Sequence, residues 1–398
     1  MRARLLRLAE VSDDEWERWA ALAERAAEPN AALDPRFLRP DRESSGGQLL
    51  VVAEEDDEWL GLVRVFSTNV SATLPIASYG TLEPSDLGPP YPLLDRAHAA
   101  EALTVIARGV RRLLHSGYLP LQGYPAFGPL AEAMQRLQRR PALGAIVVAT
   151  NSAPWVDVHP GQYAPDERVF VAQTDPDHRS VNSRKELRRS ARRLAEAGGG
   201  PLSLHDASDD PAAIDRFVAM QASGWKGDRD NGGYAVALDP ERERAFRGKA
   251  DAFRASGDLI VLELRAGTQL IYSHVYVVSG NVALGILDAY QHEYGRFSAG
   301  KLGRTAASAH LRHLPRLDAV NPGYYYYTDD EAMKVFPDRR EFADIVVGVG
   351  VVPSLAVRLL PRAEKSPLLR KMLIAMSRAD RFAMRALNGL QRRLKPKT

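Results

Sequence analysis

The stretch GNVALGILDAYQHEYGRFSAGKLGRTAASAHLRHL, residues 280–314, indicates the fold of this chain. Its first part predicts a strand that ends in LGILDAY, its last part predicts a helix, and a loop rich in glycine and cations joins them. A helix that begins after such a loop presents unpaired backbone N–H groups and the positive end of its dipole. Because this arrangement suits a phosphate or diphosphate, we predict an anion-binding loop here.

The elements around this loop occur in a defined order. Helices are predicted at about 211–223 and 240–255, and three strands follow closely, LIVLELR, QLIYSHVYVV and VALGILDAY. Short links that contain Gly267 and Gly280 join these strands, and such links favour tight antiparallel hairpins. A last strand is expected at about 323–327. The order is therefore two helices, a three-stranded meander, the anion-binding loop, a helix and a strand.

The part of the chain before residue 160 predicts a separate mixed unit. A helix is expected at 13–27, and the segments LLVVAEE and EWLGLVRVFS predict two antiparallel strands that turn at Asp56 and Asp57. A helix at about 97–115 follows, and further strands complete the unit. Helices and strands alternate with one antiparallel run, so we predict an α/β or α+β fold with mostly antiparallel mixed sheets flanked by helices.

A strongly basic helix is expected at 183–198. Ser183 and Glu186 have the spacing of a capping box, and Gly198 begins the glycine run that ends the helix. Cations occupy most of the surface of this helix. That pattern is typical either of a solvated face or of a surface for an anionic ligand or partner.

The composition is that of a soluble, globular, multidomain protein. A chain of 398 residues exceeds a single ordinary domain of roughly 150 residues. The absence of cysteine excludes disulfides, thiolate metal sites and a cysteine nucleophile, and we expect no metal site. No apolar run resembles a secretory signal or reaches the ~20 residues of a membrane span, so we expect a cytoplasmic protein.

Charge is distributed unevenly along the chain. Residues 353–398 contain twelve Lys or Arg against two acids, a surplus of ten, which leaves −7 for residues 1–352 because the whole chain carries +3. An acidic body is a poor binder of nucleic acid, so we expect no specific nucleic-acid partner. Apolar residues recur at helical spacing over 367–394, with arginines between them. Such a basic amphipathic helix lies on an anionic membrane surface, here the inner membrane, or packs on its own domain or on a second subunit of an oligomer.

Three segments in this order carry a resemblance to a known family: SRKELRRSARRLAEAG at 183–198, SGWKGDRDNGG at 223–233 and LDAYQHEYGRFSAGKL at 287–302. With them the chain resembles the GNAT acyltransferase superfamily. It resembles in particular the two-domain CelD-type branch of bacterial polysaccharide operons, which is related to the FemABX peptidyltransferases. The resemblance covers most of residues 1–350 and is strongest over 165–323.

The resemblance implies two GNAT-like domains in tandem and an enzyme that moves an acyl group from acetyl-CoA or another acyl-CoA to an amine. We expect a degenerate N-terminal GNAT-like domain at 1–160, a C-terminal GNAT-like domain with the cofactor loop at 161–352, and the helical tail at 353–398. Two details depart from the family pattern. Ala299 stands where the family loop usually has proline, and Thr328 stands where the family usually has lysine.

The candidate cofactor site is the loop and the first turn of the helix that follows it. Backbone N–H groups around Gly300 would hold the diphosphate, glycine would let the backbone approach closely, and Ser298 has the position of an N-cap. The residues assigned to cofactor binding are Arg296, Ser298, Ala299, Gly300, Lys301 and Arg304.

The candidate catalytic residues lie on the two strands before the loop. Alternation places Tyr272, His274 and Tyr276 on one face of the second strand, and Leu284, Ile286, Asp288 and Tyr290 on one face of the third. Whether these faces coincide depends on the hairpin register, which the sequence leaves open. If they do, Asp288 or His274 would accept the proton of the amine, and Tyr290 or Tyr272 would protonate the departing thiolate. A hydrogen-bonded core histidine is the alternative for His274.

Trp225 and Lys226 follow a helix and precede a loop rich in glycine and aspartate, a place where side chains often face a cleft. We expect both residues, together with Tyr272, to bind the substrate. Lys226 would neutralise an anionic group such as a uronic acid or a sugar phosphate. A core tryptophan and a surface lysine are the alternatives.

Three functions fit these observations. The first is an acyl-CoA-dependent N-acyltransferase that acts on an amine of a sugar, a polysaccharide precursor or another small molecule. The second is a FemABX-like transferase that uses aminoacyl-tRNA, with the basic helix and the tail binding RNA, although the acidic body argues against it. The third is a non-catalytic, membrane-associated scaffold of a biosynthetic complex.

Overall fold

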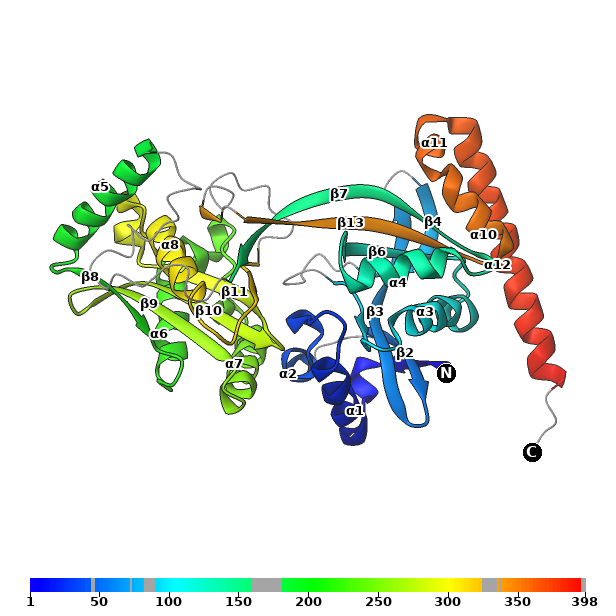
Figure 1. Ribbon diagram of the computed structural model, residues 1–398, viewed down its shortest axis with the longest axis horizontal. Helices are drawn as coiled ribbons and strands as arrows, with labels where there is room; N and C mark the ends of the chain where they lie inside the picture. The colour runs from blue at the N-terminus through cyan, green and yellow to red at the C-terminus, as the bar shows by residue number, and fades with distance from the viewer. Residues whose placement is uncertain are drawn as a thin grey trace. The chain divides into compact units, whose positions relative to one another are not determined.

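The computed structural model describes residues 1–43, 47–71, 74–81, 90–158, 181–323, 335–336 and 338–394. The chain divides into two compact units (Figure 1). Unit 1 comprises Met1–Pro35, Ser45–Ser152 and Glu341–Thr398, and unit 2 comprises Arg36–Ser44 and Ala153–Arg340. Each unit therefore combines segments that lie far apart in the sequence.

This division differs from the contiguous domains that the sequence suggests. Strand β7 (Leu143–Asp157) leads from unit 1 into unit 2, and β13 (Asp338–Val349) leads back. Residues 341–352, which we expected in the C-terminal domain, therefore belong to unit 1 together with the tail. The return depends on the antiparallel pairing of β13 with β6 (Tyr118–Pro125), a long-range contact that a local sequence pattern does not encode.

Unit 1 is a mixed α/β unit. Its other strands are β1 (Arg2–Arg7), β2 (Leu49–Glu55), β3 (Glu58–Ser71), β4 (Leu74–Gly80) and β5 (Leu93–Leu94). Its helices are α1 (Asp13–Glu24), α3 (Ala99–Leu114), α4 (Pro129–Gln138), α10 (Val351–Ala356), α11 (Leu360–Lys365) and α12 (Pro367–Leu394), and the short α2 (Pro35–Leu38) spans the boundary between the units. The strands β1-β2-β3-β4 form an antiparallel sheet, with β5 beside β3. The predicted hairpin at Asp56 and Asp57 is confirmed, and both residues adopt the positive φ that a tight turn needs.

The tail forms a helix, as expected, and part of it packs on unit 1. Leu373 is fully buried in a cluster with residues of β4 and β13, and Leu369 and Met376 pack against the same cluster. Arg111 of α3 donates two hydrogen bonds to the Asp380 carboxylate, each of 2.9 Å. One face of α12 is therefore a packed face, which is one of the alternatives that the sequence left open.

Unit 2 is built on a sheet with the strand order β12-β11-β10-β9-β8. Its strands are β8 (Leu202–Asp206), β9 (Leu259–Ala266), β10 (Gln269–Ser279), β11 (Val282–Tyr290) and β12 (Ala319–Asn321). Its helices are α5 (Val181–Ala197), α6 (Ala213–Ser223), α7 (Pro240–Ala255) and α8 (Ala299–Leu311), with 3-10 turns at η4 (Trp225–Gly227) and η7 (His292–Phe297). The predicted meander is confirmed, because β9, β10 and β11 pair antiparallel in sequence order. In Figure 1, α8 covers one face of this sheet, and α6 and α7 cover the other.

Helix α5 includes Val181, so Ser183 lies inside the helix and is not its N-cap. The strand expected at 323–327 and the departure at Thr328 lie outside the described residues, apart from Gly323. Within the described part, the next strand is the short β12, which pairs parallel to β11.

Among the helices that the structure describes, none has both the length and the apolar character needed to cross a bilayer.

Candidate functional site

The hairpin register brings the two candidate faces of β10 and β11 together. His274 pairs with Asp288 across the strands, and Tyr272 pairs with Tyr290. A carboxylate, an imidazole and two phenols therefore belong to one face of the sheet, the face that α8 covers. The sequence predicted each strand, but only the register decides that these residues meet.

One part of the predicted alternation is wrong. Ile286 has no partner on β10 and is the extra residue of a β-bulge. Because one added residue turns the neighbouring side chains to the opposite face, Leu284 does not share the face of Asp288. Gly285 lies there instead, at a position where a Cβ atom would be 3.0 Å from Nε2 of His274. Glycine at this position leaves room for the imidazole.

Asp288 is the centre of a buried charge cluster. Nε of Arg304 donates to its Oδ2 atom at 2.7 Å, and Nζ of Lys226 donates to its main-chain oxygen at 2.7 Å and lies 3.4 Å from Oδ1. Burial alone would raise the pKa of Asp288, but the two cations more than offset it and hold the pKa well below its ordinary value. The carboxylate stays ionised and paired with the two cations, so it is a poor proton acceptor. Arg304, which we predicted to bind the cofactor, pairs with Asp288 in this structure.

His274 lies in the core next to this cluster. Burial lowers the pKa of His274 to about 3, although the neighbouring Asp288 charge acts in the opposite direction. The hydroxyl oxygens of Tyr272 and Tyr276 lie 2.9 and 2.7 Å from its Nδ1 atom. The imidazole is therefore neutral at physiological pH and enclosed by phenols, which corresponds to the core alternative.

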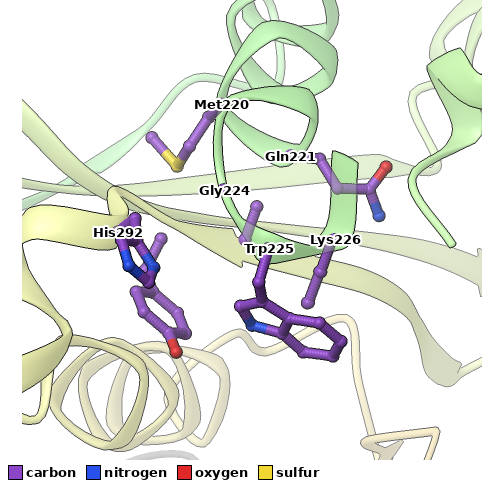
Figure 2. A pocket seen from close by; sticks show the side chains of 8 residues that line it. Met220, Gln221, Gly224, Trp225, Lys226 and His292 are labelled. Atoms are coloured by element: carbon purple, nitrogen blue, oxygen red, sulfur yellow. The ribbon is translucent and has the colours of Figure 1, made fainter. Parts of the chain in front are cut away.

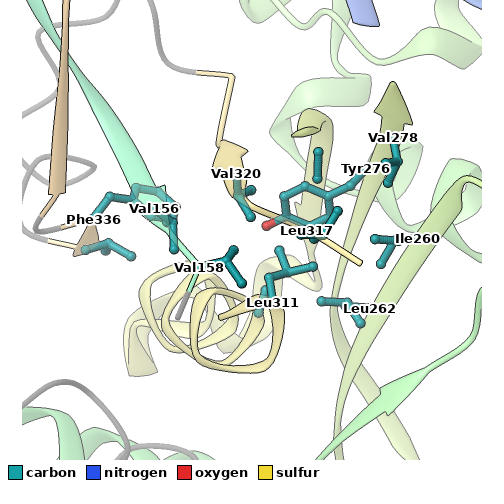
Figure 3. Close-up of a cluster of buried hydrophobic side chains, with 13 residues drawn as sticks. Val156, Val158, Ile260, Leu262, Tyr276, Val278, Leu311, Leu317, Val320 and Phe336 are labelled. Atoms are coloured by element: carbon teal, nitrogen blue, oxygen red, sulfur yellow. The ribbon is translucent and has the colours of Figure 1, made fainter. Parts of the chain in front are cut away.

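The inner side of this network is an apolar core. Tyr276 is fully buried in a cluster that contains Leu311 of α8, Val320 of β12, and Leu317 from the segment before β12 (Figure 3). Tyr272 is fully buried as well, and it lies against Gly303, where a Cβ atom would be 2.2 Å from its ring. Tyr272 is therefore a core residue in this structure, in contrast to its predicted place at the substrate, because α8 approaches β10 closely at this glycine.

The buried imidazole predicts a specific loss of stability in acid. Since the folded state holds the pKa of His274 at about 3 and an unfolded histidine titrates near ~6.5, the unfolded state binds more protons between these values. Stability should fall as the pH drops below 6.5, by about 1.4 kcal/mol per pH unit. His274→Asn keeps a polar atom near the Nδ1 position and should flatten this slope in urea unfolding measured from pH 7 to pH 4.5.

His205→Asn is the control for this measurement, because His205 lies on an exposed part of β8. This variant should retain the wild-type slope. Equal slopes for wild type and His274→Asn would show that His274 is not the group that titrates.

A small pocket lies between the end of α6 and the end of β11 (Figure 2). Two segments line the pocket. The end of α6 and the η4 turn contribute Met220, Gln221, Gly224, Trp225 and Lys226, and the end of β11 and the start of η7 contribute Ala289, Tyr290 and His292. Trp225 is 44% exposed and meets the ring of Tyr234 edge-on, with ring centroids 5.4 Å apart. The pocket therefore combines an open aromatic wall with an imidazole and a phenol.

The predicted anion-binding loop leads directly into α8. Ser298 occupies the N-cap position but has φ of 62°, and its side chain makes no capping hydrogen bond. The predicted capping role is therefore wrong, because a left-handed residue directs its side chain away from the first turn. The first intrahelical bond runs from Leu302 N to Ser298 O, so the amides of Ala299 and Gly300 precede it. The helix N-terminus itself is placed as expected.

Tyr290 connects this loop to the pocket. Its ring lies between Gly295 and Gly300, where added Cβ atoms would each be 3.2 Å from ring carbons, and it also lines the pocket. Only glycine fits these two positions without displacing the ring. An anion at the start of α8 and a molecule in the pocket would therefore both lie beside Tyr290.

The structure gathers some of the predicted site residues and separates others. Trp225, Lys226 and Tyr290 lie at the pocket, and residues 296–301 surround the helix N-terminus. His274 and Tyr272 lie behind them in the core. The sequence analysis missed His292 and Gln221. His292 is the second residue after the strand that leads to the loop, and this position was the only available signal.

Comparisons with known proteins agree with this architecture. Residues 181–327 match the family described as the acetyltransferase (GNAT) domain. The crystal structure of FemX is similar over 89% of this chain and 98% of its own, with a TM-score of 0.52 and 9% identity. The C-terminal domain of a putative lysylphosphatidylglycerol synthetase from Agrobacterium fabrum is similar over 87% of this chain and 94% of its own, with a TM-score of 0.50 and 14% identity.

A conserved protein of unknown function from Bacteroides thetaiotaomicron has a TM-score of 0.50 and 9% identity, over 87% of this chain and 98% of its own. At such identities these structures indicate a shared fold and nothing more. No curated protein matches the sequence. The family match falls on the unit that contains the pocket and the anion-binding loop. Residues 181–327 therefore match a GNAT acetyltransferase domain, and this match supports an N-acyltransferase activity.

Proposed function

We propose that this enzyme uses acetyl-CoA or another acyl-CoA to acylate an amine of a sugar, a polysaccharide precursor or a similar small molecule. The single observation that supports this most is the position of Tyr290, whose ring lies against both loop glycines and which also lines the pocket. A thioester whose diphosphate rests on the start of α8 would then reach the pocket. The resemblance to the CelD-type branch favours a sugar acceptor.

The reaction forms a C–N bond and breaks the C–S bond of the thioester. The attacking amine must lose a proton, and the departing thiolate must gain one. Asp288 is ion-paired and His274 is buried, so neither is suited to this exchange. We assign the proton transfers to His292 and Tyr290, the imidazole and the phenol of the pocket wall.

The remaining polar residues would position the two substrates. The first turn of α8 and the cations Arg296 and Lys301 would bind the diphosphate of the donor. Asp288 is a positioning residue, because its carboxylate pairs with both Arg304 and Lys226. Trp225 offers an exposed indole on which a sugar ring or another flat acceptor would pack.

Donor binding and turnover test this proposal separately. Calorimetry with acetyl-CoA and longer acyl-CoAs should show binding to the full chain, and release of free thiol should follow when amino sugars are added. His292→Gln should lower kcat by about 100-fold and leave the Kd of the donor unchanged. Failure of every acyl-CoA to bind at millimolar concentration would refute the acyl-CoA proposal.

A second donor class has one observation in its favour. Helix α5 contacts η7, and its exposed cations include Lys185, Arg188, Arg189 and Arg192. A polyanion such as aminoacyl-tRNA would find a basic surface there. In the same assay, tight tRNA binding that weakens steeply with salt, together with no acyl-CoA binding, would favour that donor over coenzyme A.

A further inference from the structure

Helix α12 exposes apolar side chains on the face opposite its packed face. Leu368 is 80% exposed, Phe382 is 77% exposed, and Met372 is 44% exposed. At 100° per residue these three side chains fall within about 80° of one another on the helix surface. Ala375 and Ala379 are exposed between them. We call Leu368, Met372, Ala375, Ala379 and Phe382 the outer stripe.

The outer stripe is not the face that folds the helix onto its own unit. Leu373 is buried on the other side, and Leu369 and Met376 pack beside it. Arg111 anchors that same side through Asp380. A surface helix that packs through one face usually presents polar residues on the other, so the outer stripe needs a separate explanation.

Exposed apolar residues are concentrated in this region. Within the described part of the chain, six of eleven large exposed apolar side chains fall between residues 351 and 382. The other three of these six, Val351, Val352 and Leu355, lie on α10, which contacts α12. Scattered single residues would need no explanation, but such a concentration marks an interaction surface.

The charge around the outer stripe indicates the kind of partner. Residues 353–398 carry a surplus of ten positive charges, and Asp380, one of the two acids, is already paired with Arg111. Lys371 and Arg378 are exposed along one edge of the outer stripe. An apolar face bordered by cations is complementary to an anionic lipid surface.

A second copy of the chain is a less suitable partner. In a twofold contact the same surface meets itself, so Lys371 and Arg378 of one copy would approach those of the other. Nothing in the stripe supplies the acidic residues that would offset this repulsion. The charge pattern therefore disfavours self-association and favours lipid.

We propose that the outer stripe of α12, together with the exposed face of α10, docks this enzyme onto an anionic membrane surface. Leu368, Met372 and Phe382 enter the interface between headgroups and acyl chains, while Lys371 and Arg378 contact the anionic headgroups. The helix lies along the surface, and its packed face stays on unit 1. The proposal does not depend on the acyl donor or the acceptor.

Vesicle cosedimentation of the full chain tests this proposal. The protein should bind vesicles that contain 30 mol% phosphatidylglycerol at least about tenfold more strongly than vesicles of phosphatidylcholine alone, and 0.5 M salt should weaken the binding. The triple variant Leu368→Ser, Met372→Ser, Phe382→Ser should reduce binding to the anionic vesicles by about tenfold or more. Lys371→Glu with Arg378→Glu should abolish the preference for phosphatidylglycerol.

Phe127→Ser is the matched control, because Phe127 is 69% exposed and lies outside α12. This variant should bind vesicles as the wild type does. All the substituted side chains are exposed, so circular dichroism and acyl transfer to a soluble acceptor should be unchanged. The proposal is overturned if the wild type ignores anionic vesicles, if the triple variant binds them normally, or if that variant instead converts a dimer to a monomer in sedimentation velocity.

Discussion

Asp288→Asn is expected to lower the free energy of unfolding by about 3 kcal/mol at pH 7. Asparagine has nearly the same shape but no charge, so Arg304 and Lys226 would remain mostly buried without the negative charge of Asp288. Their side chains are only 19% and 12% exposed, so water cannot replace the carboxylate fully. Urea unfolding followed by tryptophan fluorescence measures the loss.

Two further variants separate this effect from a general cost of substitution. Asp288→Asn combined with Arg304→Met removes the carboxylate together with one of its two cations, so the double variant should lose less stability than the two single variants together. Asp215→Asn removes an aspartate from an exposed ion pair with Arg247 and should change stability little. Equal losses for Asp215→Asn and Asp288→Asn would contradict the buried cluster.

Gly300→Asp is expected to weaken acyl-CoA binding by about 100-fold, which corresponds to ~2.7 kcal/mol. The new carboxylate would lie in the first turn of α8, where it would repel the donor diphosphate and occupy the amides in its place. Its Cβ atom would also lie 3.2 Å from Cδ1 of Tyr290 and press on the wall of the pocket. Calorimetric titration with the best acyl-CoA donor gives both Kd values.

Gly257→Asp provides the matched control. It adds the same charge at a glycine with φ of 74° and open space around it, two residues before β9 begins and therefore at the opposite end of the meander from the loop. Aspartate tolerates that conformation better than most residues. The Gly257→Asp variant should bind the donor with the wild-type Kd. An equal loss of affinity in Gly257→Asp and Gly300→Asp would indicate a long-range charge effect rather than a binding site at the start of α8.

The two predictions concern different parts of one site and fail independently. The Asp288 cluster stabilises unit 2 whether or not the donor is acyl-CoA. The Gly300 prediction depends on the donor and tests the proposed function. A stable Gly300→Asp protein that binds acyl-CoA about 100-fold more weakly, beside an Asp288→Asn protein that unfolds more easily than the wild type, is the combined outcome we expect.

Sequence reasoning worked best where the signal is local. The period-2 strands with glycine links predicted the β9-β10-β11 meander, and the strand, glycine-rich loop and helix in series predicted the N-terminus of α8. It failed where a single residue changed the geometry. The extra residue Ile286 shifted the alternation of β11, and the left-handed Ser298 removed the expected cap.

The sequence by itself determined the elements of this protein, the order of the GNAT-like motifs and the basic charge of the tail, because hydrophobic period, turn residues and charge are properties of neighbouring positions. Only the tertiary structure decided that His274 meets Asp288, that Lys226 and Arg304 neutralise this aspartate, and that α12 keeps an apolar stripe outside its packed face. Register, burial and the choice between two faces of a helix depend on contacts between residues far apart along the chain. Long-range packing fixes those contacts, and no local pattern contains them.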